Sequence, residues 1–188
     1  MKRTILLALG TTLFLACNNK PAETTEAAKD TTAAVKETKP PAQSEFADPK
    51  YVEIGKANLA KLSSGDIDGF ADSYADNAVY VWSRGDSVAG KPAIIKYWKE
   101  RRGKVIDSLK YFNDVWLAIK VNTSQKPGAD LPGVWVMAWY GTSVKYKNKN
   151  KVVFYAHTLN HFNDNDKIDR TIMFIDYAPI NKASGVVK

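Results

Sequence analysis

The segment that most constrains the fold spans residues 151–177, where two runs rich in β-branched and aromatic side chains flank a polar stretch at 163–166. That stretch consists of asparagines and aspartates, which favour turns and tolerate positive φ angles, so the segment predicts a β-hairpin. In its second strand, Ile172 and Phe174 occupy even positions, and Asp176 continues the alternation. Side chains of one parity share one face of a strand. We therefore expect the Asp176 carboxylate either to enter an apolar pocket or to lie at the solvated end of the strand.

The chain as a whole has the size and composition of one folded domain. Its 188 residues are 45% hydrophobic and 11% aromatic, which allows one sizeable core. The net charge of +7 is spread over many lysines and arginines without a nucleic-acid-binding motif, so we expect a solvated surface and no nucleic-acid partner. The single cysteine, Cys17, excludes an intramolecular disulfide and metal sites built from several cysteines. No motif for a cofactor or a metal is present, so we expect neither.

The N-terminus has the pattern of a signal peptide. Lys2 and Arg3 precede an apolar run that ends at Ala16, and this run of about 12 residues is too short to span a bilayer. Ala16 followed by Cys17 resembles the lipobox of bacterial lipoproteins, in which the cysteine carries lipid. We predict a signal peptide at 1–16 and lipid on Cys17 as the contact with a membrane. The protein would then lie in the bacterial cell envelope, facing the periplasm or the outside.

Residues 18–44 have the composition of a tether. They are rich in Ala, Thr, Lys, Glu and Pro, and Val35 is their one large aliphatic residue. So little apolar surface cannot offset the entropy lost on ordering the chain. We predict a disordered linker at 17–45, a folded domain at 46–181 and a flexible tail at 182–188.

Three helical patterns follow the linker. Asp48 and Pro49 predict the start of the first helix, Asp66 predicts the cap of a shorter second helix, and residues 90–92 open the third. The strand pattern at 78–82 lies between the second and the third helix.

The third helical pattern ends in a basic cluster of Lys99, Arg101 and Arg102. Cations in a last turn interact favourably with the negative end of the helix dipole, which is sufficient to explain the cluster. Anion binding is the alternative.

Strand patterns fill the second half of the chain. Residues 105–112 and 115–121 are separated by Asn113 and Asp114, which predict a bulge or a tight turn. Residues 133–147 are apolar on both faces, so this strand must be covered by helices on one side and by something else on the other. We expect a homodimer that pairs through this outer sheet face. Helices first and an antiparallel sheet after them indicate an α+β domain.

The order of the motifs resembles the SnoaL-like branch of the nuclear transport factor 2-like superfamily. The resemblance rests on a short Gly-Asp-x-x-x-Phe helix at 65–70, the turn at 74–77, an aromatic strand, and the Gly-Lys-Pro-Ala-Ile sequence at 90–94. It continues in Lys167-Ile168 of the last hairpin and covers residues 48–180. It implies a cone-shaped (cystatin-like) α+β fold, in which N-terminal helices pack on a strongly curved, mostly antiparallel sheet and leave a cavity open at one end.

The same resemblance implies a role for Asp176, which corresponds to the aspartate that often closes the final strand of the family. An apolar environment would raise the pKa of this carboxyl and suit it to proton abstraction. The alternative is an aspartate at a solvated strand end or in an ion pair.

The histidines and one asparagine are further candidates. His157 and His161 share a strand face but lie about 13 Å apart, too far to bind one metal ion. If the other parity faces the cavity, Asn160 enters it, at a point where related ketosteroid isomerases carry an acidic oxyanion-hole residue. An amide can donate a hydrogen bond but cannot act as an acid, and both histidines are also consistent with surface or interface positions.

Aromatic residues are numerous enough to line an apolar pocket, although they also form cores. The candidate ligand-binding residues are Tyr80, Trp82, Trp98, Trp139 and Phe174.

Two functional hypotheses follow. The first is a membrane-tethered binding module whose cavity takes a small hydrophobic molecule or whose sheet pairs with a protein partner. The second is a cofactor-free isomerase, cyclase or hydrolase-like enzyme, with Asp176 as base and Tyr80, His157 or Asn160 polarising the substrate.

Overall fold

The computed structural model describes residues 42–122 and 131–185. The predicted signal peptide, Cys17 and most of the predicted linker lie outside the described residues, as does the end of the predicted tail. The helices are α1 (Lys50–Ser64), α2 (Ile67–Ala71), α3 (Lys91–Glu100) and α4 (Tyr177–Ser184), with a π-helical turn η1 (Arg101–Val105) directly after α3. The strands are β1 (Ser44–Phe46), β2 (Tyr74–Trp82), β3 (Ser87–Ala89), β4 (Ile106–Val121), β5 (Gly133–Tyr146), β6 (Lys151–Phe162) and β7 (Ile168–Phe174). Among these elements, no helix has the length and apolar character needed to cross a membrane.

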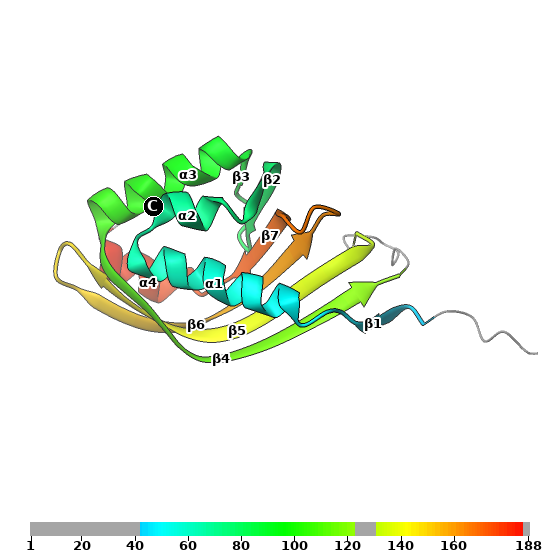
Figure 1. Ribbon diagram of the computed structural model, residues 1–188. Coiled ribbons are helices and arrows are strands. Elements are labelled where there is room, and N and C mark those ends of the chain that lie inside the picture. Colours follow the sequence, from blue (N-terminus) through cyan, green and yellow to red (C-terminus); the bar gives the residue numbers. More distant parts are fainter. Residues whose placement is uncertain (1–41, 123–130, 186–188) are drawn as a thin grey trace, which may run out of the picture. The chain divides into compact units, whose positions relative to one another are not determined.

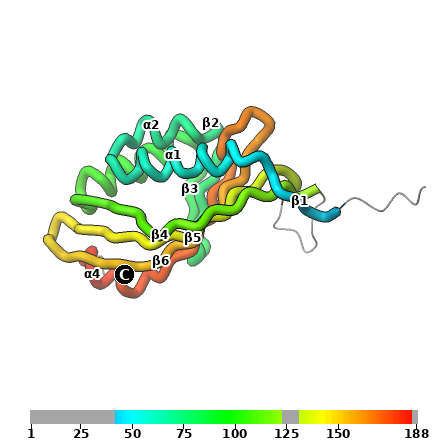
Figure 2. Tube along the Cα trace, turned by 60° about the horizontal axis from the view of Figure 1, so that its bottom comes forward, coloured from blue at the N-terminus to red at the C-terminus, as the bar shows by residue number. Residues whose placement is uncertain are grey.

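The strands form one curved sheet in the order β1-β4-β5-β6-β7-β2-β3. All neighbouring pairs are antiparallel except β2 and β7, which are parallel. The long strands β4, β5 and β6 curl around α1, α2 and α3, which lie together on one face of the sheet (Figures 1 and 2). The predicted α+β fold, with helices packed on a strongly curved and mostly antiparallel sheet, is confirmed.

Local sequence signals set the helix ends as predicted. The Asp48 carboxylate accepts a hydrogen bond from the Lys50 backbone N–H (2.8 Å), and the Asp66 carboxylate accepts one from the Gly69 N–H (2.9 Å). Gly65 ends α1 with a φ of 89°, a left-handed conformation that costs glycine little. These contacts satisfy backbone groups that a helix end leaves free.

The sequence at Asn113 and Asp114 forms a bulge and not a turn. The β4–β5 pairing shifts between Phe112 and Val115, and Asn113 has a φ of 51°. The extra residues let β4 continue as one long, bent strand, because a bulge increases local twist and bend.

The hairpin of β6 and β7 is also confirmed, and its turn is tied to the start of α1. The Asn163 carboxamide oxygen accepts hydrogen bonds from two backbone N–H groups of the turn, those of Asn165 and Lys167. The Asp166 carboxylate accepts from Lys50 Nζ (2.8 Å) and from the Tyr51 hydroxyl (2.7 Å). These two hydrogen bonds lower the pKa of Asp166.

Three elements differ from the sequence-based boundaries. β1 lies mostly within the predicted linker and pairs with β4, and β3 was not predicted. α4 continues to Ser184, beyond the predicted end of the domain at 181. Its last turn is held by Asn148 and Asn150 of the β5–β6 turn, whose side-chain amides donate to the Ala183 carbonyl at 3.0 and 3.1 Å.

The β7 side chains that point to the inner face of the sheet also differ from those predicted. Its pairing with β6 passes from His161–Arg170 to Phe162–Ile168, so Asp169 is an extra residue in β7. This irregularity inverts the alternation for the rest of the strand. Thr171 and Met173 are buried on the inner face, which carries the helices, whereas Phe174 is exposed on the outer face.

Candidate ligand-binding site

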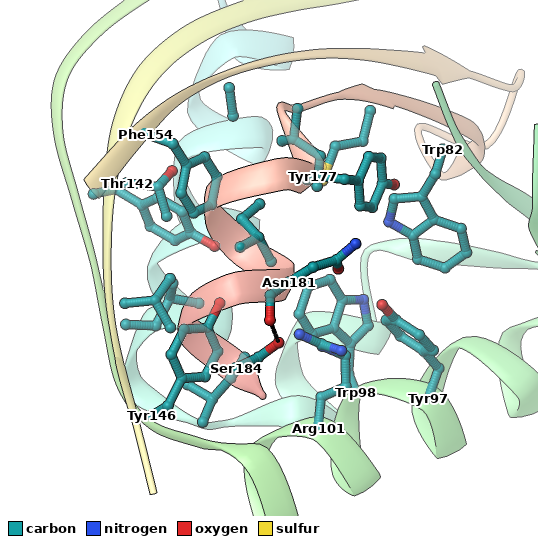
Figure 3. A pocket seen from close by; sticks show the side chains of 18 of the residues that line it. Trp82, Tyr97, Trp98, Arg101, Thr142, Tyr146, Phe154, Tyr177, Asn181 and Ser184 are labelled. Carbon is teal, nitrogen blue, oxygen red and sulfur yellow. Dashed lines mark hydrogen bonds between the residues drawn. The ribbon is translucent and has the colours of Figure 1, made fainter. Parts of the chain in front are cut away.

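A cavity of about 250 Å³ lies between the inner face of the sheet, α3 and α4 (Figure 3). It is lined by Trp82 and Arg84 at the end of β2; Tyr97, Trp98 and Arg101 of α3 and η1; Ile106, Leu109 and Tyr111 of β4; Tyr140, Thr142, Val144 and Tyr146 of β5; Phe154 and Ala156 of β6; Met173 and Ile175 at the end of β7; and Tyr177, Ile180, Asn181 and Ser184 of α4. The two central strands contribute every second residue, as expected for one face of a sheet. Most of the wall is apolar or aromatic, which is typical of small-molecule sites.

Apart from the Tyr140 hydroxyl, which lies near the Thr158 side chain, three polar atoms at this wall have no hydrogen-bond partner among the described residues. They are the indole Nε1 of Trp98, the hydroxyl oxygen of Thr142 and the hydroxyl oxygen of Tyr177, and each is buried. Buried polar groups in folded proteins are nearly always paired, and an unpaired one is energetically costly. Unpaired polar atoms on a cavity wall therefore identify positions where a ligand can bind favourably.

The cavity tyrosines act as neutral hydrogen-bonding groups. Burial raises the pKa of Tyr140 and of Tyr177 to about 12, and it raises the pKa of Tyr97 and Tyr111 as well. At neutral pH these phenols keep their protons. They can polarise a ligand by donation, but they cannot serve as bases.

Two arginines lie at the cavity wall, and only one of them forms an ion pair with a described residue. Arg84 forms a two-fold contact with Asp86, at 2.5 Å for each N–O pair, and its guanidinium stacks 4.5 Å from the centre of the Tyr177 ring. Arg101 lies 5.8 Å from the centre of the Tyr97 ring and makes no ion pair with any described residue.

Asp176 does not line the cavity, so the pocket position, one of the two that the sequence left open, is wrong. Its side chain is exposed and accepts a hydrogen bond from the Ala178 backbone N–H (2.9 Å), which makes it the N-cap of α4. The extra residue in β7 is the physical reason, because it turns the parity of Phe174 and Asp176 to the outer face. The structure thus places Asp176 at the solvated strand end, the alternative left open by the sequence.

Asn160 does face the interior, but away from the main cavity. It is buried and accepts a hydrogen bond from the Thr171 hydroxyl (2.7 Å), which in turn contacts the Tyr74 hydroxyl (3.2 Å). Asn160 and Tyr80 line a separate cavity of about 20 Å³, which has room for little more than one water molecule. Since its amide is already engaged, Asn160 contributes to packing at this end of the domain.

His157, Trp139 and Phe174 lie on the outer face, so the expectation that Trp139 and Phe174 line the cavity is wrong, and His157 has the surface position that the sequence left open. Their rings stack in a row across three strands, with centroid distances of 4.6 Å from Trp139 to His157 and 5.8 Å from His157 to Phe174. Trp139 is 42% exposed and Phe174 is 45% exposed. Among the predicted ligand-binding residues, Trp82 and Trp98 line the main cavity.

The sequence did not identify Thr142, Tyr177 or Asn181 as site residues, and it gave Arg101 only as part of a basic cluster. One signal was available for Arg101. It follows Trp98 by three positions in a helical pattern, and residues three apart share a helix face. No comparable signal marks α4, whose short sequence lacks a long apolar repeat.

No family model matches this chain, and no curated protein matches it. Solved structures do match. A proposed isomerase from Bacillus subtilis is 15% identical with a TM-score of 0.58, and the match covers 73% of this chain and 94% of that chain. A proposed SnoaL-like polyketide cyclase from Shewanella denitrificans OS-217 is 11% identical with a TM-score of 0.56, covering 72% and 97%. An LEH-like epoxide hydrolase from M. tuberculosis is 16% identical with a TM-score of 0.53, covering 72% and 89%.

Identities this low establish the fold and no more. The matched part of the chain corresponds to nearly the whole length of each neighbour, so the likeness concerns a complete domain. Further neighbours are described as a nuclear transport factor 2-like protein and as a protein with a ketosteroid isomerase-like fold. The domain therefore has the SnoaL-like, nuclear transport factor 2-like fold that its sequence resembles.

Proposed function

We propose that this domain binds a small, mostly apolar molecule in the cavity between the sheet, α3 and α4. The observation that carries the proposal is the cavity itself, about 250 Å³ with a largely aromatic wall and three unpaired buried polar atoms. An apolar cavity of about 150 Å³ is large enough for benzene, so this one can hold a molecule of about two fused rings.

The wall favours binding over acid–base catalysis. Among the described residues, none that lines the cavity is an aspartate, a glutamate or a histidine. The tyrosines are held protonated by burial. With Asp176 outside the cavity, the hypothesis of an enzyme that uses it as general base has no support from the geometry, and the activities of the structural neighbours are not transferred to this chain.

A neutral two-ring compound, 2-naphthamide, tests the proposal. Trp82 and Trp98 lie at the cavity wall, so binding should quench intrinsic tryptophan fluorescence and can be confirmed by calorimetry. We expect a dissociation constant of about 100 µM or lower for a ligand of this size. Absence of any saturable binding would contradict the proposal.

A cavity-filling variant locates the binding. Ala156 is buried at the cavity wall, so Ala156→Leu reduces the available volume and should weaken naphthamide binding at least tenfold. The matched control is Ala178→Leu, the same change at an exposed position of α4, which should leave affinity unchanged. Thermal unfolding of both variants checks that they are folded. Unchanged affinity in Ala156→Leu would show that the compound binds elsewhere.

We further propose that lipid on Cys17 anchors this binding domain to a membrane of the bacterial cell envelope. Support comes from the basic residues, the short apolar run and the Ala16-Cys17 pair at the N-terminus. Labelling of bacterial cells with an alkyne-bearing fatty acid should mark the wild-type protein and not Cys17→Ser. Equal labelling of both proteins, or recovery of unlabelled wild type in the soluble fraction, would contradict the proposal.

A further inference from the structure

Two hydrogen-bond donors of α3 and the following turn face the same end of the cavity. Trp98 and Arg101 are three residues apart, and both line the cavity wall (Figure 3). Trp98 is 7% exposed, and its indole Nε1 has no partner among the described residues. An indole N–H can only donate, so the group that satisfies it must be an acceptor.

Arg101 has no counter-ion, unlike two other cations near it. Lys99, two positions earlier, pairs with Asp68 at 2.7 Å, and Arg84, which also lines the cavity, pairs with Asp86. Arg102 has no ion pair among the described residues, but it donates to the Ser63 carbonyl and does not line the cavity. No described carboxylate lies within ion-pair distance of Arg101. The helix dipole favours every cation of the basic cluster alike, but among the three only Arg101 lines the cavity.

The positive charge of Arg101 acts on two tyrosines of the cavity wall. Burial raises the pKa of Tyr97 and of Tyr146, and the Arg101 guanidinium acts on both in the opposite direction by favouring the phenolate. This end of the cavity is therefore electrostatically positive. The carboxamide of Asn181 lies on the same side, close to the Trp98 ring in Figure 3.

The sheet side of the cavity carries no charged group. Most of its wall is apolar, namely Val144 of β5, Phe154 and Ala156 of β6, Met173 of β7 and Ile175, and its donors are neutral hydroxyls such as that of Thr142 beside Phe154 (Figure 3). The site is therefore divided into a positively charged end at α3, which can bind an anionic acceptor, and an uncharged, mostly apolar side at the sheet.

From this division we propose that the ligand is a small monocarboxylic acid with an apolar body of up to about two fused rings. One carboxylate suits a single unpaired guanidinium, which binds carboxylates with parallel N–H donors, and a second oxygen acceptor suits the Trp98 N–H. The apolar body packs against the sheet. This inference rests on the proposed binding function and specifies the ligand class of the same cavity.

A pair of nearly isosteric compounds tests the inference on the unmodified protein. 2-Naphthoate carries the carboxylate, and 2-naphthamide replaces it with a neutral amide of similar size. Hydrogen bonds to charged groups are stronger than neutral ones, so naphthoate should bind at least tenfold more tightly at pH 7 and low salt. If naphthamide binds as tightly as naphthoate, the ligand class is wrong while the binding function stands. If neither compound binds, the binding function itself fails and the ligand class fails with it.

Variants assign the selectivity to Arg101. Arg101→Gln should lower naphthoate affinity about tenfold or more while changing naphthamide affinity by no more than about twofold. The matched control is Lys99→Gln, which removes the same charge two positions earlier in the chain but at an exposed ion pair. It should preserve the preference for naphthoate. Equal losses in the two variants would show that the preference reflects overall charge, which would overturn the assignment to Arg101.

A second variant tests the indole N–H. Trp98→Phe keeps an aromatic ring and removes the donor, so it should weaken naphthoate binding more than naphthamide binding. Preservation of the full naphthoate preference in Trp98→Phe would exclude the indole from carboxylate recognition. The comparison of the two compounds on wild type remains decisive if either variant fails to fold.

Discussion

The two faces of the central strands carry similar side chains and have different surroundings. On the inner face, rings such as Tyr140 are buried and surround a cavity, whereas on the outer face Trp139, His157 and Phe174 form an exposed row. Tyr140 and Trp139 are consecutive in β5, with 1% and 42% of their surfaces exposed. Aromatic content alone therefore does not locate a binding site; the curvature of the sheet and the helices over one face decide which rings enclose a space.

Tyr140 and Trp139 should differ strongly in how much each side chain stabilises the fold. Tyr140→Ala removes a buried ring and should lower the free energy of unfolding by about 3 kcal/mol, the lower end for loss of a large core residue. Trp139→Ala should cost about 1 kcal/mol or less in the monomer, since its ring is partly solvated. Urea unfolding at low protein concentration measures both. Equal losses would mean that the outer face is as tightly packed as the inner one.

The second prediction concerns what covers the outer face. Exposed apolar residues gather there, namely Val115, Trp139, Val153, Tyr155 and Phe174, and we propose that two copies of the chain pair through this face. Sedimentation should then show a concentration-dependent dimer, and Trp139→Lys should weaken it at least tenfold. A monomer at high concentration would contradict the proposal.

A third prediction distinguishes a cap from a base at Asp176. Asp176→Ala removes the N-cap of α4 and should lower the free energy of unfolding by about 1 kcal/mol. Asp176→Asn retains a capping oxygen and should stay close to wild type in stability and in naphthamide affinity. If Asp176→Asn instead abolished binding while the protein remained folded, the carboxylate would belong to the site after all.

The contact of Asp166 with Lys50 and Tyr51, which links the hairpin turn to α1, should make a small, pH-dependent contribution to stability. Because Lys50 and Tyr51 lower the pKa of Asp166 in the folded state, the unfolded chain takes up this proton more readily. The stabilisation is present above the unfolded pKa of about 4 and is lost as the pH falls through the lower folded-state value. Urea midpoints should therefore fall between pH 7 and about pH 3, and by less in Asp166→Asn. Asp164→Asn in the same turn is the control, and it should keep the wild-type pH response.

Local features were predictable from the sequence wherever one residue determines the geometry. Asp66 was expected to cap a helix, the asparagines and aspartates at 163–166 were expected to form a turn, and Asn113 marked an irregularity in β4. Each expectation holds because the deciding interaction lies within a few residues of the chain.

The site was less predictable because it depends on contacts between distant segments. The facing of β7 depends on the extra residue at Asp169, and no special residue type marks it. The cavity requires α4 to reach the β5–β6 turn, a contact made by Asn148 and Asn150 that apolar periodicity does not reveal. Trp82 and Trp98 were placed at the cavity wall, whereas Trp139 and Phe174 were assigned to the wrong face.

The single added residue in β7 has a consequence for how relatives of this chain are compared. An alignment that omits it would match Met173 to outward-facing positions and Phe174 to inward-facing ones. It would also give a catalytic role to Asp176, which caps α4. Deleting Asp169 should have the same effect physically. Thr171 and Met173 would then face solvent, and Phe174 would face the inner side of the sheet.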